Sequence, residues 1–194
     1  MKKIITKEIR DSISKRNRLV IGIILIVIMI LSTAGFALNY ESGNDQEYSK
    51  ITYNGITFLR NGDYWNFNSN GQDLMTKHNP EETKDVIISS RTYLDSYQNK
   101  PLYFVTETGM PDYEIGRNLN NFVLRIQNAC IKGENCSTSL PIKDCKNDNI
   151  IIIKEVKDNE REKIYQEDKC VYIISSFSNQ TKYTDAFVFR VLGI

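Results

Sequence analysis

The chain is organised around one apolar stretch, Leu19-Val-Ile-Gly-Ile-Ile-Leu-Ile-Val-Ile-Met-Ile-Leu-Ser-Thr-Ala-Gly-Phe-Ala-Leu38, which contains no charged side chain. As an α-helix this stretch would be about 30 Å long, which matches the hydrocarbon thickness of a bilayer. Thirteen of its residues are Leu, Ile, Val or Phe. Together they contribute about −4 to −8 kcal/mol to membrane insertion. A core helix of this length normally carries polar residues on one side. We therefore predict a transmembrane helix over residues 19–38.

The charges on either side of this stretch predict its orientation. Residues 1–18 carry seven basic and two acidic side chains, a net charge of +5, whereas the rest of the chain carries 18 basic and 22 acidic side chains, a net charge of −4. After Leu38 no basic residue occurs before Lys50. The positive-inside rule then leaves the basic tail in the cytoplasm and places the following domain outside the cell membrane, held by a single-pass signal-anchor. A mildly acidic domain gives no electrostatic reason to expect a nucleic-acid partner.

A cleaved signal peptide is the alternative interpretation of the same segment. Residues 19–31 fit its apolar core, and Ser32-Thr33-Ala34 or Gly35-Phe36-Ala37 supply the small residues of a cleavage site. The basic segment is long for a signal peptide, however, and the apolar run continues to the length of a membrane span. We favour the uncleaved anchor, and both interpretations place the domain outside.

Four cysteines, Cys130, Cys136, Cys145 and Cys170, all follow the apolar stretch. Thiols oxidise outside the membrane, so an even number predicts two disulfides, for which the sequence allows three pairings. We favour Cys145–Cys170, because each residue precedes an apolar strand, with Cys130–Cys136 closing a short loop. The longer loop would contribute roughly 3 kcal/mol in the chain-entropy model. A zinc site is the alternative, but these cysteines lack the close pairs that are typical of structural zinc.

After a polar linker over residues 39–50, we predict one α+β domain over residues 51–194. Its first third contains short β-branched and aromatic segments, separated by Asn-Gly pairs at residues 54, 61 and 70. Asn-Gly favours two-residue hairpin turns because both residues tolerate positive φ. We therefore predict an opening β-meander, in which the first pair is either a turn or a bulge within one longer strand.

The remainder of the domain mixes helical and strand patterns. Residues 79–87 begin with Asn-Pro-Glu-Glu, which favours the start of a short helix. Residues 101–107 predict a strand that begins at proline. The apolar runs at 150–156 and 170–174 predict buried strands.

The longest helix of the domain is predicted from an N-cap at Asp112 to the vicinity of Gly133. The apolar residues that recur at helical spacing are Ile115, Leu119, Phe122, Val123, Ile126 and Cys130. Two other segments are left open by the pattern. The charged residues 158–167 fit a loop, a hairpin or a short helix, and the apolar segment 185–194 fits a helix or a strand docked into the core.

The sequence contains no recognisable catalytic, cofactor or metal motif. It lacks a phosphate-binding glycine loop, H-E-x-x-H and G-x-S-x-G. The one histidine, His78, is predicted at a turn before a helix, where an exposed histidine is ordinary. Asn135-Cys136-Ser137 and Asn179-Gln180-Thr181 are candidate glycosylation sites. We assign no catalytic, cofactor-binding or metal-binding residue, and expect no cofactor.

Several short motifs of the outer domain form a set. They are Tyr53-Asn-Gly55, Leu140-Pro-Ile-Lys-Asp-Cys145, Asn149-Ile-Ile-Ile-Ile-Lys-Glu155, Tyr165-Gln-Glu-Asp-Lys-Cys170, and Asp185-Ala-Phe187 with Leu192-Gly-Ile194. The set resembles an uncharacterised family of small single-span archaeal membrane proteins. The resemblance covers most of the outer domain. It implies a membrane anchor and disulfides, and it implies no activity.

Three functional hypotheses fit these observations. The favoured one is a non-enzymatic module, anchored in the lipid bilayer through residues 19–38, that binds or assembles with an envelope protein or glycan. The second is a type IV pilin-like subunit, which would require the apolar helix to continue through residues 39–50. The third is an envelope hydrolase with an unrecognised site.

Overall fold

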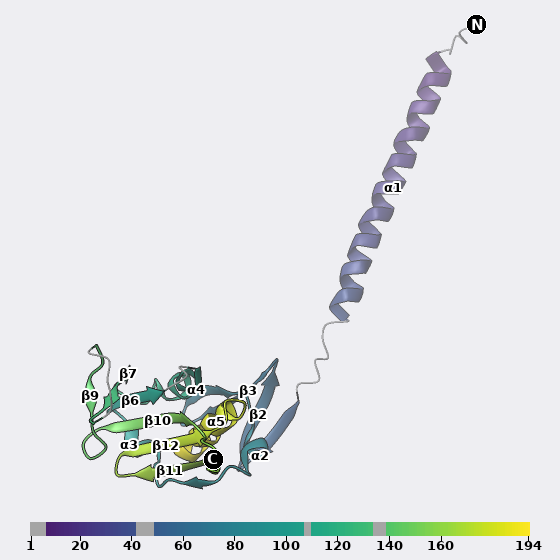
Figure 1. Cartoon of the computed structure of the whole chain (residues 1–194). Helices are drawn as coiled ribbons and strands as arrows, with labels where there is room; N and C mark the ends of the chain where they lie inside the picture. Colours follow the sequence, from purple (N-terminus) through teal and green to yellow (C-terminus); the bar gives the residue numbers. More distant parts are fainter. Residues whose placement is uncertain (1–6, 42–48, 107–109, 134–138) are drawn as a thin grey trace. The chain divides into compact units, whose positions relative to one another are not determined.

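The computed structural model divides the chain into two compact units, Met1–Glu47 and Tyr48–Ile194. The residues that the structure describes are 7–41, 49–106, 110–133 and 139–194, with side chains described over 15–32, 49–106, 113–133 and 139–194. The described part of the first unit is helical, and the second contains sheets and helices (Figure 1). The predicted α+β class of the second unit is thus confirmed.

The first unit is built on α1, Lys7–Glu41, a helix of 35 residues. It includes all of the predicted span and the first three residues of the predicted linker, and β1 begins at Lys50. In the part of the chain that the structure describes, no helix reaches the length and apolar character required of a membrane span.

The predicted β-meander is confirmed as a four-stranded antiparallel sheet. In chain order its strands are β1 (Lys50–Tyr53), β2 (Ile56–Asn61), β3 (Tyr64–Ser69) and β4 (Gln72–Thr76). Both residues of Asn54-Gly55 have positive φ, as do both residues of Asn70-Gly71. This is the backbone geometry of a tight hairpin turn, so the first pair is a turn and not a bulge. At the second turn Asn61 pairs with Tyr64, which leaves Gly62-Asp63 as the turn residues.

The larger sheet has six strands in the order β5-β11-β12-β10-β6-β7. Their bounds are β5 (Ile88–Ser89), β6 (Pro101–Thr106), β7 (Arg125–Asn128), β10 (Asn149–Glu155), β11 (Lys163–Glu167) and β12 (Cys170–Ser175). Strands β6, β7, β10 and β12 are parallel, whereas β11 and β5 run in the opposite direction. The two strands predicted as buried, β10 and β12, lie at the centre (Figure 1). Continuous apolar runs are typical of such strands.

One face of the large sheet forms the main core. It packs with the meander and with two helices, α4 (Met110–Leu119) and α5 (Gln180–Leu192). Because side chains alternate along a strand, Ile151 and Ile153 of β10 point to this face. Phe187 of α5 is fully buried among them. The undecided C-terminal segment is therefore a helix. It is buried on most sides because α4, α2 (Pro80–Thr83), β11 and β12 contact it, and Phe189 packs against Phe58 and Phe67 of the meander.

The other face of the large sheet carries a smaller apolar cluster around Ile150 and Ile152. Tyr103, Ala129 and Cys170 complete its buried part. A two-stranded parallel ribbon adjoins this region, formed by β8 (Cys130–Ile131) and β9 (Ile142–Lys143). The segment between this ribbon and β10 contains Cys145, which forms a disulfide with Cys170.

The predicted helix from Asp112 to the vicinity of Gly133 is wrong in its second half. The helix α4 begins at Met110, which places Asp112 within its first turn, and it ends at Leu119. The chain then turns and forms β7 on the open edge of β6. There its backbone groups gain partners, and Phe122 and Ile126 still reach the main core. The spacing of the apolar residues after Leu119 therefore fits a helix and an edge strand equally. Only pairing with β6 makes this segment a strand.

The remaining predictions concern shorter elements. The expected helix at residues 79–87 is shortened to α2, Pro80–Thr83, and its start is stabilised by a capping box in which Asn79 and Glu82 satisfy each other's backbone N–H groups. The open segment 158–167 ends as β11, which forms a hairpin with β12. A further short helix, α3 (Leu94–Tyr97), precedes β6.

Candidate binding site

A pocket of about 400 Å³ lies where three strands of the large sheet begin. Its walls include Pro101, the first residue of β6, Asn149, the first residue of β10, and Lys169, which directly precedes β12. Because these three strands are parallel, their N-terminal ends meet at one edge of the sheet. The pocket therefore brings together residues that are up to 77 positions apart in the sequence, from Thr92 to Lys169.

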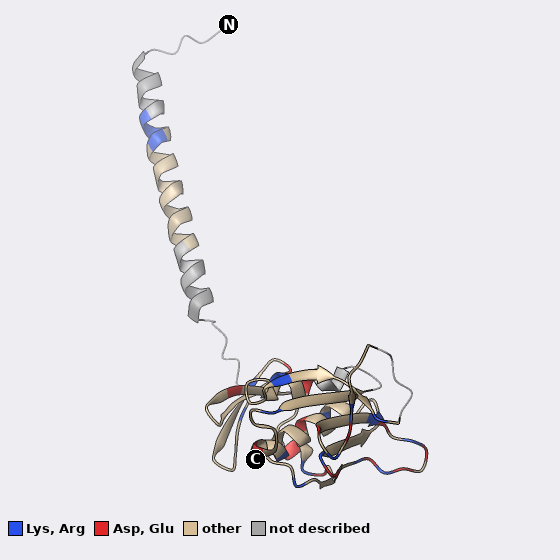
Figure 2. Ribbon diagram, turned by 90° about the vertical axis from the view of Figure 1, so that its left-hand side faces the viewer, with Lys and Arg blue, Asp and Glu red and all other residues tan. Residues whose placement is uncertain are grey.

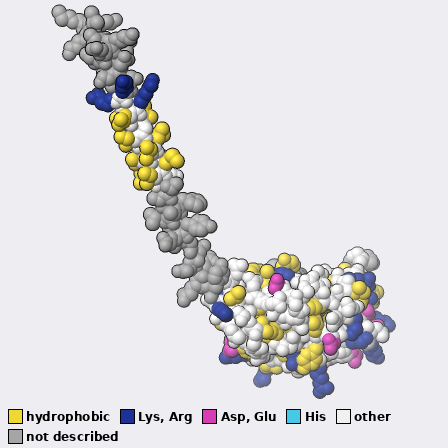
Figure 3. Space-filling view, turned by 180° about the vertical axis from the view of Figure 1, so that it is seen from behind, with side chains coloured by type: hydrophobic (Ala, Val, Ile, Leu, Met, Phe, Trp, Pro, Cys, Tyr) yellow, Lys and Arg dark blue, Asp and Glu magenta, His cyan; other side chains and the backbone are white. Residues whose placement is uncertain are grey.

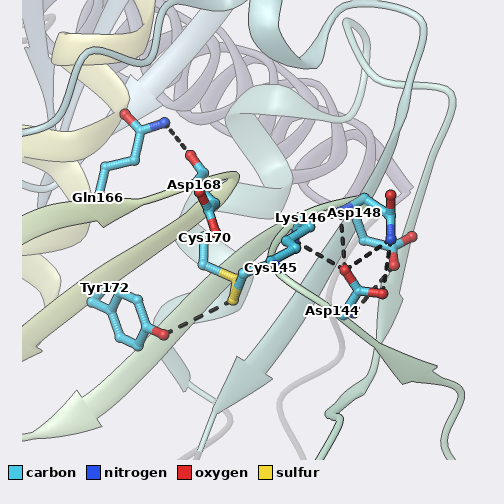
Figure 4. Close-up of a disulfide and its surroundings, with 9 residues drawn as sticks. Asp144, Cys145, Lys146, Asp148, Gln166, Asp168, Cys170 and Tyr172 are labelled. Carbon is cyan, nitrogen blue, oxygen red and sulfur yellow. Dashed lines mark hydrogen bonds between the residues drawn. A yellow bond between two sulfur atoms is a disulfide. The ribbon is translucent and has the colours of Figure 1, made fainter.

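The Cys145–Cys170 disulfide joins two of the chain segments that line this pocket. It links the segment before β10 to the first residue of β12 (Figure 4). Beside it, the backbone N–H of Lys169 donates to the carbonyl of Cys145 at 2.8 Å, and the N–H of Ile150 donates to the carbonyl of Lys169 at 3.2 Å. The predicted Cys145–Cys170 pairing is confirmed. The disulfide covalently fixes this wall of the pocket.

The turn between Cys145 and β10 is shaped by Asp144. Its side chain accepts hydrogen bonds from the backbone N–H groups of Lys146 and Asn147, each at 3.0 Å, and from the Asn147 amide (Figure 4). These bonds, with that from the Asn147 side chain the largest, lower the pKa of Asp144. The ionised carboxylate thus holds the turn that presents Asn147 and Asp148 to the pocket.

A second wall comes from α3 and the start of β6. The ammonium group of Lys100 donates to the carbonyl of Asp95 at 3.0 Å and to that of Ser96 at 3.2 Å. The Asn149 amide also donates to the carbonyl of Ser96, at 3.2 Å. Carbonyls at the end of a helix lack partners within the helix. Lys100 and Asn149 supply those partners and are positioned in the pocket as a result.

A third wall is held by Gln166 of β11. Its side-chain oxygen accepts from the backbone N–H of Arg91 at 3.0 Å and from the hydroxyls of Ser90 and Thr92 at 3.3 Å. Its side-chain nitrogen donates to the carbonyl of Asp168 at 2.8 Å (Figure 4). A side chain with this many partners has few alternative rotamers, so this wall is preorganised.

Tyr103 brings a polar group into the pocket from β6. Its hydroxyl accepts a hydrogen bond from Arg125 at 2.9 Å, and the ammonium of Lys143 lies 4.3 Å from its ring centroid. The hydrogen bond from Arg125, followed by that from Lys143, lowers the pKa of Tyr103. Lys143 also pairs with Asp148 at 3.2 Å. The positive charges of Arg125 and Lys143 cause this lowering, so this corner of the pocket is electropositive.

His78, the only histidine, lies elsewhere and is not a pocket residue. Its Nδ1 is 2.9 Å from a carboxylate oxygen of Asp185, and its backbone N–H donates to the same oxygen at 2.9 Å. Asp185 lies on α5 and is fully buried. Burial raises the pKa of Asp185, while the bonds from His78 oppose that rise. The contact ties the corner between β4 and α2 to α5, across 107 residues of sequence. The sequence contains no local signal for this contact.

A second buried carboxylate lies in the same region. Glu114 of α4 forms an ion pair with Arg117 one turn later. Burial, the largest cause, raises the pKa of Glu114, and the negative charge of Asp185 adds to that rise. The guanidinium of Arg117 also lies 4.8 Å from the ring centroid of Tyr64. These contacts join α4 to the meander.

The candidate modification sites divide between described and undescribed residues. Cys130 is disulfide-bonded, and its expected partner Cys136 lies outside the described residues, as does the sequon residue Asn135. The amide of Asn179 donates to Glu162 at 2.9 Å at the start of α5, so a glycan at this site would replace a hydrogen bond of the fold. Within the described residues no group of three or more His, Cys, Asp or Glu side chains gathers as a metal site would require.

Comparison with known proteins adds no relative. No protein-family model matches the chain, and no curated protein and no solved structure matches it.

Proposed function

We propose that this chain is a single-pass membrane protein whose outer domain binds a small polar component of the cell envelope. The observation that supports the anchor is the apolar character of α1 on every side. From Leu19 to Leu31 the helix has no charged or polar side chain on any face. Figure 3 shows the apolar side chains along the helix, with Lys and Arg side chains at one end. Lipid can cover a helix on all sides, whereas docking on a protein surface covers only one.

The outer location is supported by charge and by cysteine chemistry. Lys15, Arg16 and Arg18 precede the apolar part of α1, and cations at this end favour a cytoplasmic N-terminus. The Cys145–Cys170 disulfide follows the anchor in the chain, and disulfides persist in oxidising compartments. In the second unit Lys, Arg, Asp and Glu are interspersed (Figure 2). Interspersed charges of both signs favour solubility outside the bilayer.

A binding role is supported by the hydrogen bonds and the ion pair that hold the pocket residues in place. Gln166, Asp144 and Asn149 hold walls in place, and Lys143 neutralises Asp148. These contacts preorganise a concave polar site, which lowers the entropic cost of binding.

An envelope hydrolase is the second candidate, favoured by the His78–Asp185 contact. A general base oriented by a carboxylate is a feature of such enzymes.

The anchor and its orientation can be tested in cells that express the full chain. We expect the protein to stay with membranes after extraction at alkaline pH. Lys157→Cys, in an exposed loop after β10, should react with a membrane-impermeant maleimide in intact cells. The matched variant Lys3→Cys should react only after the cells are permeabilised. Recovery of the protein in the soluble fraction, or labelling of Lys3→Cys alone in intact cells, would refute the proposed function.

A further inference from the structure

We infer that the pocket at the strand starts binds a hydroxylated carboxylate of monosaccharide size, such as a uronic acid. This inference rests on the proposed binding function and names the ligand class. The pocket volume of about 400 Å³ lies in the lower part of the range for small-molecule sites, roughly 300–1,000 Å³. One sugar-sized molecule suits that volume better than an extended polymer.

The charge balance of the pocket favours an anion. Lys100 and Lys169 bring two ammonium groups to its lining. The carboxylate of Asp148 also lines it, but one of its oxygens pairs with Lys143 at 3.2 Å and the other accepts from the backbone N–H of Asp144 at 3.2 Å. The negative charge is therefore compensated within the protein. The two lysine charges form a positive surplus that a ligand carboxylate can neutralise.

Both ammonium groups keep hydrogen-bond donors for a ligand. An ammonium has three N–H donors. Lys100 uses two of them, on the carbonyls of Asp95 and Ser96, and Lys169 uses one, on the carbonyl of Asn147. These bonds also immobilise the two side chains. A ligand that accepts the remaining donors therefore binds groups that have already lost much of their conformational entropy.

Neutral groups of the pocket match ligand hydroxyls. The Tyr103 hydroxyl accepts from Arg125, which leaves its own proton free to donate. Asn149 donates one amide hydrogen to Ser96, which leaves its side-chain oxygen to accept. A sugar hydroxyl both donates and accepts, so it can satisfy both kinds of group. A simple anion would satisfy the donors alone.

The arrangement differs from that of a typical phosphate site. Phosphate is usually held by the N–H groups of a helix N-terminus or by the two-pronged guanidinium of arginine. Here the cations are lysines on two different walls, because Lys100 precedes β6 and Lys169 precedes β12. A molecule with a carboxylate and several hydroxyls can contact both walls and the groups between them.

The test uses the full-length protein in detergent micelles and follows backbone amide chemical shifts in an NMR titration. The probes are sodium D-glucuronate, D-glucose and sodium phosphate at equal ionic strength. We expect glucuronate to shift the amides of Asn149 and Lys169 and to bind at least tenfold more tightly than glucose or phosphate. Lys169→Gln and Lys100→Gln should each weaken glucuronate binding about tenfold, whereas Lys157→Gln, which removes the same charge at the opposite end of β10, should leave it unchanged.

Three results would overturn the inference: equal affinity for glucuronate and glucose, phosphate binding as tight as that of glucuronate, or an equal loss in Lys157→Gln and Lys169→Gln. Absence of any shift with glucuronate would overturn it too. Lys100 also supports α3, so circular dichroism checks that Lys100→Gln folds, and Lys100→Arg should restore most of the affinity. Because the labelling experiment does not involve a ligand, a failure of glucuronate binding in a correctly anchored protein refutes the ligand class alone.

Discussion

Replacing both Cys145 and Cys170 with alanine is expected to lower the free energy of unfolding by about 4 kcal/mol. The two cysteines are 25 residues apart, and for a loop of this length the chain-entropy relation gives about 3.5 kcal/mol. Cys170 is fully buried, so the loss of its sulfur adds on the order of 0.5 kcal/mol. A change of this size is a large fraction of the stability of an ordinary domain, roughly 5–15 kcal/mol.

The assay is urea unfolding of the full chain in mild detergent, followed by the fluorescence of Trp65. This is the only tryptophan of the chain. It is 4% exposed and lies in the meander, away from the substituted residues, so it reports global unfolding. The single variants Cys145→Ala and Cys170→Ala are matched controls, because each also removes the cross-link. All three variants should agree to within about 1 kcal/mol.

The same substitution should have a local signature at the pocket wall. The amide hydrogens of Lys169 and Ile150 bond across the disulfide-linked segments, so their exchange with solvent should accelerate more than that of Ile173 in the middle of β12. A fall in unfolding free energy of less than about 1 kcal/mol, with unchanged exchange at Lys169, would refute the reasoning that the disulfide holds this wall.

Three further predictions concern the core. Burial raises the pKa of Asp185 above its usual 3.8, so the contribution of the Asp185 carboxyl to stability is full below pH 3.8 and falls as the pH rises through the folded-state pKa. In urea titrations, Asp185→Asn should therefore be less destabilising at pH 7 than at pH 4. An equal effect at both pH values would contradict this. Phe187→Ala should lower the unfolding free energy by about 3–5 kcal/mol, because this ring is fully buried, while the exposed Phe177→Ala serves as its control and should change little. Asn79→Ala should cost about 0.5–2 kcal/mol by removing the capping box of α2; a thermal melt that matches the wild type would exclude that role.

The elements that the sequence predicted correctly depend on nearby residues. Asn70-Gly71 forms the predicted turn because both residue types tolerate positive φ, and Asn54-Gly55, which the pattern left as a turn or a bulge, forms a turn for the same reason. The helix start at Asn79 needs only a partner three residues away. The apolar run of β10 predicts a buried strand in any parallel sheet. The Cys145–Cys170 pairing is favoured among three possible pairings because each cysteine comes shortly before or at the start of an apolar run, and the structure confirms it.

The membrane anchor is also inferred from neighbouring residues, but it stays a prediction. Its length, its lack of charge and the cations before it are all properties of consecutive residues. The same holds for the resemblance to single-span archaeal proteins, which depends on short motifs and is not tested by any relative.

Only the tertiary structure decided the features that join segments distant in the sequence. Arg125–Asn128 is a strand because β6 offers it an open edge, and the apolar spacing before it cannot signal that edge. The partner of His78 is 107 residues away, and the pocket combines Lys100 with Lys169, whose proximity no local sequence pattern indicates. Turns, caps and apolar runs are encoded within a few residues, because the interactions that stabilise them are local. A site between parallel strands exists only after the sheet order brings their starting points together.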